Sequence, residues 1–437
     1  MPHATKKPEE GKDKKKMSED TSNNSGNMME DDTVPALPDN PDGVINEDDI
    51  EDIIEVDKAA PAPLSDDEDE INKPPQQQQQ QNPELSEREQ KFVDDINNIL
   101  LNDDSKQGFF EHKDAVYSVH LSPDDQNLCV SGDGDDQAYV WNISNGEVVH
   151  KLSGHTDTVN NVQFSNDGKF VATGSMDSTI RVYSSADGNL HTTLEGPDSD
   201  IEWFSWHGKG HVIVAGSSDT SVWMWNAANG SVMRVFSGHQ GAVLCGAFNC
   251  TGKLVVTGGE DGSVYVWNPK SGQANHKAIS LHDAPINSLA CALDSNLVLT
   301  GGQDHVMSLY NADSGKVLSS FAEHSDSVES VAFCPTLKLA SSGSLDKSIK
   351  VWDLSTGTCR LTLKHDDGVI CTRWHPSEPL LYSCSLDKTV RLWDARTGEQ
   401  AAKWGGHQDA VLCMAISGNG STVVSGSDDK TALVFKR

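Results

Sequence analysis

An internal repeat with a period of 41 to 43 residues is the feature that most constrains the fold of this chain. Seven units begin with a histidine, namely His112, His155, His239, His282, His324, His365 and His407. Eight units carry an aspartate, namely Asp135, Asp177, Asp219, Asp261, Asp304, Asp346, Asp387 and Asp429. Six residues after each aspartate stands an aromatic, in order Trp141, Tyr183, Trp225, Trp267, Tyr310, Trp352, Trp393 and Phe435. Such a period indicates stacked copies of one supersecondary unit, so the eight units predict the architecture better than the length does.

Each unit reads as four short strands separated by turn residues. In the second unit, strand patterns cover residues 159–164 and 170–174 on either side of the turn Asn166-Asp167-Gly168. Two more cover residues 179–183 and the segment after Asp187-Gly188. A lone four-stranded sheet leaves both faces open to water, whereas a closed ring of such sheets covers the faces and leaves only short edges. We therefore predict an all-β fold, an eight-bladed β-propeller.

The two ends of the repeat region predict how the ring closes. Residues 431–435 read as a third strand with no fourth strand after it, and residues 107–110 read as a fourth strand with no unit before it. The N-terminal strand should therefore pair with residues 431–435 and complete the last blade, which gives a propeller domain over residues 105–437. Deleting residues up to Phe110 is expected to open the ring, whereas deleting only to about Gln80 is not.

The first 104 residues differ in composition from the repeats. They hold 29 acidic and 10 basic side chains, few aromatics and six consecutive glutamines from Gln76 to Gln81. Such a segment buries too little apolar area to offset its ordering entropy, so we expect a disordered acidic tail. Apolar residues at helical spacing favour a short helix over residues 84–101, and the mixed acidic and apolar run Val44 to Val56 offers a docking motif. A solubilising tail with a weakly packed helix is the other interpretation.

Charge and cysteine content narrow the class of partner and the compartment. The net charge is −32, so we expect no direct binding to nucleic acid and an attraction to a basic protein segment. No apolar run reaches the roughly 18 to 20 residues that span a bilayer, which argues against a membrane protein. Nine cysteines without a CxxC pair favour reduced thiols, hence a cytoplasmic or also nuclear location. We expect a monomer.

The recurring histidine, hydroxyl, aspartate and aromatic residues predict a structural network rather than a catalytic centre. A hydroxyl stands ten residues before the aromatic in seven units, so the histidine can link an aspartate to that hydroxyl and the hydroxyl to an indole. A Ser/His/Asp set repeated once per blade is scaffolding, since catalysis needs one set in one cleft. We predict no enzyme activity, no metal and no cofactor. The network residues are His155, Thr173, Asp177, His239, Thr257, Asp261, Trp267, His324, Ser342, Asp346, Trp352, His365, Ser383, Asp387 and Trp393.

The third unit departs from this rule. Pro197 replaces its histidine and Ala215 replaces its hydroxyl, although Asp219 and Trp225 remain. Functional sites often break a local rule, so the loop from Gly196 to Trp203 is a candidate binding segment, with simple drift as the alternative.

The Gly-His and Trp-Asp dipeptides at this period resemble those of WD-repeat proteins over residues 105–437. They stand at Gly154-His155, Gly238-His239, Gly406-His407, Trp352-Asp353 and Trp393-Asp394. More narrowly, three segments look like the angio-associated migratory cell protein group, namely Glu51 to Val56, Ile201 to His207 and Trp223-Met224-Trp225. Fungal relatives of that group are dedicated chaperones of a large-subunit ribosomal protein of the L-ten type. The resemblance implies that the chain holds the basic N-terminal segment of that protein until late assembly of the 60S subunit.

On the narrow side of a propeller, exposed positions lie three and five residues after the blade histidine and one before the blade aspartate. We call this side the top face, and no Lys or Arg occupies any of these positions. A disc of acids and apolar side chains suits a basic amphipathic segment, because exposed ion pairs contribute only about 0.2–1 kcal/mol each and apolar contacts must add the rest. An ordinary solvated rim is the alternative. The predicted partner-binding residues are Tyr117, Met176, Asp200, Glu202, Trp203, Leu244, Glu260, Glu329, Leu345, Ile370, Leu386, Leu412 and Asp428.

Two rival functions remain open. The box Trp393-Asp394-Ala395-Arg396 resembles the adaptor-binding motif of substrate receptors of cullin-type ubiquitin ligases, unless Arg396 merely braces its turn. Co-purification with a ligase adaptor that is lost on Arg396→Ala would favour that function. A signalling or cell-migration scaffold is the second rival, although the sequence carries no lipidation motif.

Overall fold

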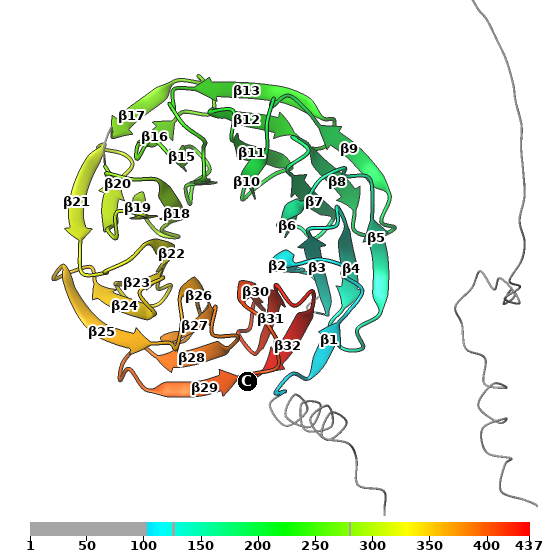
Figure 1. Cartoon of the computed structure of the whole chain (residues 1–437). Coiled ribbons are helices and arrows are strands. Elements are labelled where there is room, and N and C mark those ends of the chain that lie inside the picture. Colours follow the sequence, from blue (N-terminus) through cyan, green and yellow to red (C-terminus); the bar gives the residue numbers. More distant parts are fainter. Residues whose placement is uncertain (1–102, 125–126, 279–280) are drawn as a thin grey trace, which may run out of the picture. The chain divides into compact units, whose positions relative to one another are not determined.

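The computed structural model describes residues 103–124, 127–278 and 281–437. The predicted tail, its helix over residues 84–101 and the glutamine run lie outside the described residues. In the described ranges the secondary structure is all β, with 32 strands in eight four-stranded antiparallel sheets. Figure 1 shows these sheets as the blades of a ring around a central axis. The predicted all-β, eight-bladed β-propeller is confirmed.

The blades follow one another along the chain. Blade 1 is β2 (Val116–Leu121), β3 (Leu128–Asp133), β4 (Ala138–Asn142) and β5 (Val148–Leu152); blade 2 is β6 (Val159–Phe164), β7 (Phe170–Ser175), β8 (Ile180–Ser184) and β9 (Leu190–Leu194); blade 3 is β10 (Ile201–Trp206), β11 (Val212–Ser217), β12 (Ser221–Asn226) and β13 (Ser231–Ser237); blade 4 is β14 (Cys245–Phe248), β15 (Val255–Gly258), β16 (Val264–Trp267) and β17 (Ala274–Ala278). Blade 5 is β18 (Ile286–Cys291), β19 (Leu297–Gly302), β20 (Met307–Asn311) and β21 (Lys316–Phe321); blade 6 is β22 (Val328–Phe333), β23 (Leu339–Ser344), β24 (Ser348–Asp353) and β25 (Thr358–Lys364); blade 7 is β26 (Val369–Trp374), β27 (Leu380–Ser385), β28 (Val390–Asp394) and β29 (Gln400–Trp404); blade 8 is β30 (Val411–Ile416), β31 (Thr422–Ser427), β32 (Ala432–Lys436) and β1 (Gln107–Phe109).

The core lies between blades. The second and third strands are covered on both faces, so strands such as β7 and β23 are buried along almost their whole length. The outermost strands are half exposed, and β13 leaves Val232, Met233 and Val235 open to solvent. Each apolar cluster draws its side chains from two neighbouring blades, so one blade has no complete core of its own. Stability therefore depends on a closed ring of blades, as the repeat predicted.

Strand β1 closes the ring by pairing antiparallel with β32. Gln107 stands opposite Val434, and Phe109 stands opposite Ala432. Figure 1 shows the two ends of the described chain, β1 in cyan and β32 in red, side by side in one blade. Phe109 is buried and stacks on the indole of Trp141 in blade 1, at 4.9 Å between ring centres. Phe110 is 69% exposed and lies outside the strand, so β1 ends one residue before the predicted strand does.

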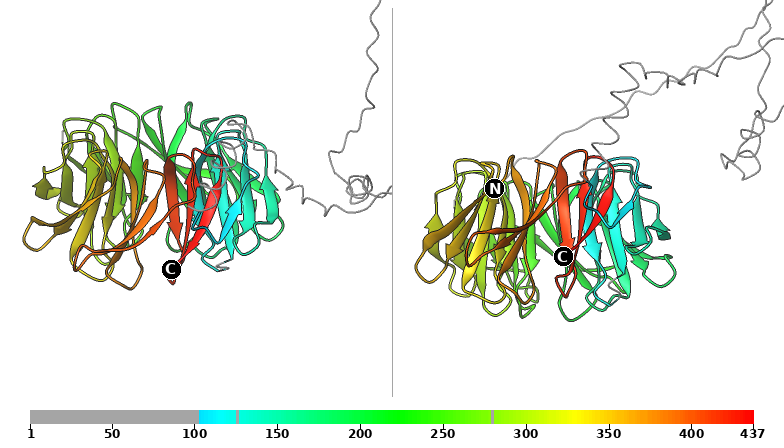
Figure 2. Two further views of the ribbon diagram at one scale, coloured as in Figure 1. Left: turned by 60° about the horizontal axis from the view of Figure 1, so that its bottom comes forward. Right: turned by 90° about the horizontal axis from the view of Figure 1, so that it is seen from below.

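Figure 2 shows the strands running between two faces of the ring, each formed by loops. The turn between the second and third strands of each blade lies on the top face together with the loop that leads into the next blade. Each such turn holds one residue with a left-handed backbone, for example Ser178 at φ 68° and Lys347 at φ 67°. The blade aspartate steadies the turn, since Asp177 accepts from the backbone N–H of Thr179 at 3.0 Å. The tight turn fixes the side chain before the aspartate and the side chain after it on the top face.

Candidate protein-binding face

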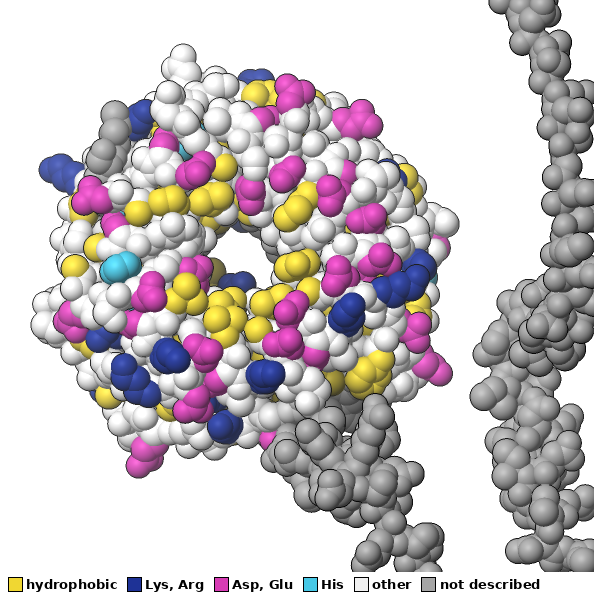
Figure 3. All heavy atoms as spheres, in the orientation of Figure 1, with side chains coloured by type: hydrophobic (Ala, Val, Ile, Leu, Met, Phe, Trp, Pro, Cys, Tyr) yellow, Lys and Arg dark blue, Asp and Glu magenta, His cyan; other side chains and the backbone are white. Residues whose placement is uncertain are grey.

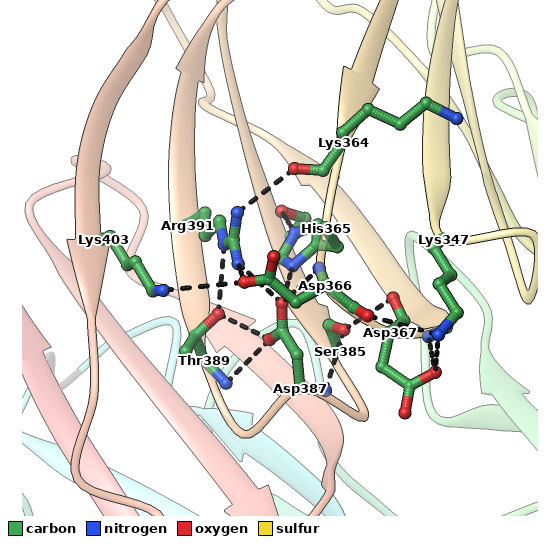
Figure 4. A network of polar contacts seen from close by, with 12 residues as sticks. Lys347, Lys364, His365, Asp366, Asp367, Ser385, Asp387, Thr389, Arg391 and Lys403 are labelled. Atoms are coloured by element: carbon green, nitrogen blue, oxygen red, sulfur yellow. Dashed lines mark hydrogen bonds and ion pairs between the residues drawn. The ribbon is translucent and has the colours of Figure 1, made fainter.

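A repeated hydrogen-bond network joins the top of each blade to its core. In blade 7, His365 Nδ1 lies 2.8 Å from Asp387 Oδ2, and His365 Nε2 lies 2.8 Å from Ser383 Oγ. The indole N–H of Trp393 donates to the same Ser383 Oγ at 2.9 Å. An indole only donates, so the hydroxyl proton goes to His365 Nε2 and the Nδ1 proton to Asp387. Figure 4 shows the acidic end of this network, where Arg391 also reaches Asp387 and Asp366.

We call this arrangement the blade network, and the histidine contacts recur in seven blades. The histidine-to-hydroxyl pairs outside blade 7 are His112 with Ser131, His155 with Thr173, His239 with Thr257, His282 with Thr300, His324 with Ser342 and His407 with Ser425, all at 2.7–2.8 Å. The indoles of Trp141, Trp267 and Trp352 donate to the hydroxyls of their own blades at 2.8–3.0 Å. The remaining histidine–aspartate pairs of the predicted set, formed by Asp177, Asp261 and Asp346, lie at 2.8–3.2 Å.

Blade 1 corrects one predicted residue. The partner of His112 is Asp133, whose Oδ2 lies 2.7 Å from Nδ1, and not Asp135. Asp133 is the last residue of β3, at a position where other blades carry a serine such as Ser175 or Ser344. Its carboxylate also accepts the backbone N–H groups of the turn, at 3.0 Å from Asp135 and 3.1 Å from Gln137. Asp135 is left about half exposed on the top face.

Blade 3 replaces the network with backbone contacts. Without a histidine, Asp219 accepts from the backbone N–H of Asp198 at 2.9 Å. Without the hydroxyl, the indole N–H of Trp225 donates to the carbonyl of Glu195 at 3.1 Å. Trp223 stacks on Trp225, with 5.9 Å between the ring centres. Asp219 and the indole N–H of Trp225 thus find other partners, and the altered loop carries no set of catalytic groups.

Burial favours the neutral form of three network histidines. Burial lowers the pKa of His239, His324 and His365, against the opposing pull of the aspartates that they face. Burial alone would raise the pKa of Asp346, but hydrogen bonds from Ser348 and His324 outweigh it and hold the pKa at about 2. A neutral histidine between a fixed carboxylate and a fixed hydroxyl holds its protons in place, so the network stabilises the blade and offers no base to a substrate.

The same pKa shifts predict a loss of stability in acid. An unfolded histidine binds a proton near pH 6.5, whereas folded His239, His324 and His365 resist protonation, so lowering the pH favours unfolding. Each histidine that stays neutral contributes up to about 1.4 kcal/mol per pH unit in that window. Thermal unfolding at constant ionic strength should show a melting temperature that falls steadily from pH 6.5 to pH 4.5. An exposed control, His305→Gln, should keep the same slope, and a flat profile would contradict the neutral state of these three histidines.

The prediction that Trp203 lies exposed on the top face is wrong. Its side chain is buried, at 6% exposure, and packs between blades 3 and 4 with Val214, Val243 and Val255. A bulge after Ile201 turns Trp203 toward the neighbouring blade. Gly216 and Gly246 make room for the indole, because a side chain at either glycine would overlap it. Trp203 is therefore a wedge between blades and not a ligand contact.

The other twelve predicted partner-binding residues all keep some exposure. Tyr117, Met176, Glu260 and Asp428 are exposed, and the other eight are half-buried, namely Asp200, Glu202, Leu244, Glu329, Leu345, Ile370, Leu386 and Leu412. Figure 3 shows that hydrophobic and acidic side chains surround the central opening on this face, with most Lys and Arg side chains nearer the rim. The top face thus joins apolar side chains and acids around one opening.

The opening leads into a central channel of about 800 Å³ lined by the innermost strands. Tyr117, Glu329, Ile370 and Leu412 stand at its top end. Leu345 and Leu386 from neighbouring blades converge above Gly368, where a Cβ would lie 2.8 Å from one leucine and 3.2 Å from the other. The glycine leaves room for both leucine side chains. An apolar side chain of a ligand can be covered there without moving the backbone.

The carboxylates on this face are held mostly by neutral donors. The hydroxyl of Ser218 donates to Glu202, and the hydroxyl of Ser327 donates to Glu329 at 2.5 Å. The backbone N–H of Ala242 donates to Glu260 at 3.3 Å. Neutral donors orient a carboxylate without cancelling its charge. These acids can therefore still bind a cation.

Arg396 is engaged within its own turn. Its Nε donates to Asp394 Oδ1 at 3.0 Å, and its Nη2 donates to Asp394 Oδ2 at 2.5 Å. This fork braces the turn between β28 and β29, on the face opposite to the top face, although the Arg396 side chain is 62% exposed. The geometry fits the structural interpretation of the Trp-Asp-x-Arg box.

Within the described ranges, no three His, Cys, Asp or Glu side chains are placed to hold a metal ion. The same residues contain no helix long and apolar enough to cross a membrane.

The ring of eight blades, the blade network and the recurring Trp-Asp dipeptides define the chain as a WD-repeat β-propeller, a non-enzymatic protein-binding fold. The family described as WD domain, G-beta repeat, matches residues 315–353, 357–394 and 398–436. The family described as IFT122 first beta-propeller matches residues 115–312.

Among individual proteins, the chain is homologous to angio-associated migratory cell protein of Homo sapiens, with 43% identity over 72 residues, which is 16% of this chain and 17% of that protein. It is 48% identical over 86 residues to an uncharacterized WD repeat-containing protein of Schizosaccharomyces pombe, 20% of this chain and 21% of that one. The aligned segments thus span about a fifth of the length of these relatives.

Two solved structures have the same architecture. Chaetomium thermophilum Sqt1, bound to the N-terminus of the ribosomal protein L10, is 27% identical, with a TM-score of 0.71 over 77% of this chain and 100% of that one. Saccharomyces cerevisiae Sqt1 is 23% identical, with a TM-score of 0.70 over 77% of this chain and 99% of that one, and shares the fold.

Proposed function

We propose that this chain is a dedicated chaperone that binds the basic N-terminal segment of a ribosomal protein of the L10 type during late assembly of the large subunit. The observation that carries the proposal is the top face, where acids held by neutral donors alternate with apolar side chains around one opening. A solved structure of the same fold holds the N-terminus of ribosomal protein L10. We place the activity in the cytoplasm, and also in the nucleus, and expect the chain to act as a monomer.

The physical argument follows from the chemistry of the two partners. A basic segment that is disordered when free loses affinity to its own ordering, so it needs both steering by charge and apolar contacts. Glu260 and Asp428 offer exposed charge, and Tyr117, Ile370 and Leu412 offer apolar surface at the channel mouth. The affinity should therefore fall as salt screens the acids.

Charge reversal on the top face tests the function. We expect Glu260→Lys with Asp428→Lys to weaken binding of an N-terminal L10 peptide more than tenfold in calorimetry, because two attractive charges become repulsive. Both side chains are exposed, so the fold should be unaffected. Glu399→Lys, in the exposed turn between β28 and β29 on the opposite face, is the control and should change affinity less than twofold.

Affinity purification with the same three proteins then identifies the natural partner. Recovery of one basic ribosomal protein by the wild type and by Glu399→Lys, but not by the double variant, would support the chaperone function. Recovery of ligase adaptors or receptors by all three proteins would refute it.

A further inference from the structure

Lysines of three consecutive blades reach across to the next blade on the top face. Each stands directly after the blade aspartate, at the left-handed position of its turn. Lys347 Nζ donates to the backbone carbonyl of Asp366 at 3.3 Å and lies 3.2 Å from the carboxylate of Asp367, as Figure 4 shows. The same pair of contacts is made by Lys388 with Gln408 at 2.6 Å and Asp409 at 3.9 Å, and by Lys430 with Lys113 at 2.8 Å and Asp114 at 4.0 Å.

We call the line where two blades meet on the top face a seam. In these three seams, each aspartate stands two residues after the blade histidine, and the lysine of the preceding blade neutralises it. The sequence predictions missed these lysines, because they considered the position before the blade aspartate and not the one after it. A lysine directly after the blade aspartate in three successive units is the signal that could have found them.

The seam between blades 1 and 2 has acids at both positions. Asp136, at φ 63°, takes the turn position of Lys347, and Asp157 takes the loop position of Asp367. Asp157 accepts from the backbone N–H of its neighbour Thr158 at 2.7 Å, just as Asp367 does from Gly368 at 2.9 Å. In the part of the chain that the structure describes, neither Asp136 nor Asp157 forms an ion pair. The seam thus holds two facing acids where three others hold a lysine and an acid.

The crowding of these carboxylates has an electrostatic cost. Partial burial raises the pKa of Asp136, and the charges of Asp157 and Asp135 raise it further. Lys113 lies 4.0 Å from Asp135 and is 76% exposed, so it screens the seam weakly. A cation placed between Asp136 and Asp157 would relieve this repulsion.

We propose that the seam between blades 1 and 2 binds a Lys or Arg side chain of the partner, in the place that Lys347, Lys388 and Lys430 hold in the other seams. This inference rests on the proposed function and names the anchor for its basic segment. The cation would bridge Asp136 and Asp157 and donate to the backbone carbonyl of Thr156, which corresponds to the carbonyls of Asp366, Gln408 and Lys113.

Two exposed apolar side chains on the same blades support a ligand at this seam. Tyr117 of blade 1 is 45% exposed and Met176 of blade 2 is 39% exposed. The aliphatic stem of a Lys or Arg can pack on such side chains while its charged end reaches the acids.

Matched substitutions in the seam between blades 1 and 2 and in a seam that already holds a lysine test the proposal. The probes are an N-terminal L10 peptide and a hexa-arginine peptide, titrated against the full chain by fluorescence anisotropy. Asp136→Lys should weaken binding of both about tenfold, because it installs the chain's own lysine in the seam. Asp157→Asn should weaken it about fivefold. Asp409→Asn, at the same position in a seam that Lys388 already neutralises, should change it less than twofold.

The stability of the variants separates binding from folding. Asp136→Lys should melt at or above the wild-type temperature, since lysine serves in this position in three other blades. Equal losses of peptide affinity for Asp157→Asn and Asp409→Asn would overturn the proposed binding site at the seam and leave only a general attraction between charges. If the L10 peptide fails to bind the wild type, the proposed function falls, and the hexa-arginine series then decides the seam alone: the same order of variants supports it, and no binding overturns it.

Discussion

Deletion of residues 1–110 is expected to destabilise the propeller by about 5 kcal/mol or more, because it removes the strand that closes the ring. The cut eliminates the pairing of β1 with β32 and the buried ring of Phe109. It exposes the edge of β32 and the face of Trp141 on which Phe109 stacks. Urea denaturation followed by tryptophan fluorescence measures the loss directly.

Two neighbouring phenylalanines provide the matched control. Phe109→Ala should cost about 3–5 kcal/mol, as large-to-small changes of a buried aromatic do, whereas Phe110→Ala should stay within about 0.5 kcal/mol because its ring is largely exposed. Deletion of residues 1–80 should leave the denaturation midpoint unchanged. If the chain without residues 1–110 unfolded at the wild-type midpoint, the ring would not depend on β1.

Trp203→Ala should lower the free energy of unfolding by about 3–5 kcal/mol, since it empties the space between blades 3 and 4. Trp203→Phe should cost far less. It keeps most of the apolar ring and removes an indole N–H that is buried without a hydrogen-bond partner. Urea titration of the two variants measures both effects.

The adjacent residue separates a structural role from a binding role. Glu202 lies half-buried on the top face, and Glu202→Gln keeps the contact with Ser218 while removing the charge. This variant should unfold like the wild type and bind the L10 peptide more weakly. A stable Trp203→Ala protein that has lost affinity for the peptide would instead make Trp203 a ligand contact.

The fold could be predicted because its signal recurs eight times. Turn residues, apolar strands and the spacing from histidine to aspartate agree from unit to unit, so an error in one blade does not change the architecture. The strand that closes the ring could also be located, since one end of the repeat lacks a strand that the other end supplies. The place of each residue within its blade is set by local backbone geometry, and this geometry repeats with the sequence.

Single residues were harder to place where one blade differs from the average. Asp133 performs in blade 1 the role that the spacing assigned to Asp135, because the end of β3 brings its carboxylate to His112. Trp203 occupies a position where other blades carry a small polar residue, such as Ser330, whose Oγ accepts the backbone N–H of Thr372 at 3.0 Å. The sequence shows the tryptophan but not the bulge that points it between blades, nor the two distant glycines that accommodate it.

Ring closure by the first strand also dictates when the chain can finish folding during its synthesis. Asp104 and Gly405, which meet at this junction, lie 301 residues apart. At a translation rate of about 5–20 residues per second, Asp104 waits roughly 15 to 60 s for Gly405, and the first strand waits still longer for β32. Until then blade 1 has only one neighbour, and its core side chains have no cover on the other side. The nascent chain therefore passes through a long interval with an open edge, during which a ribosome-associated chaperone would protect it best.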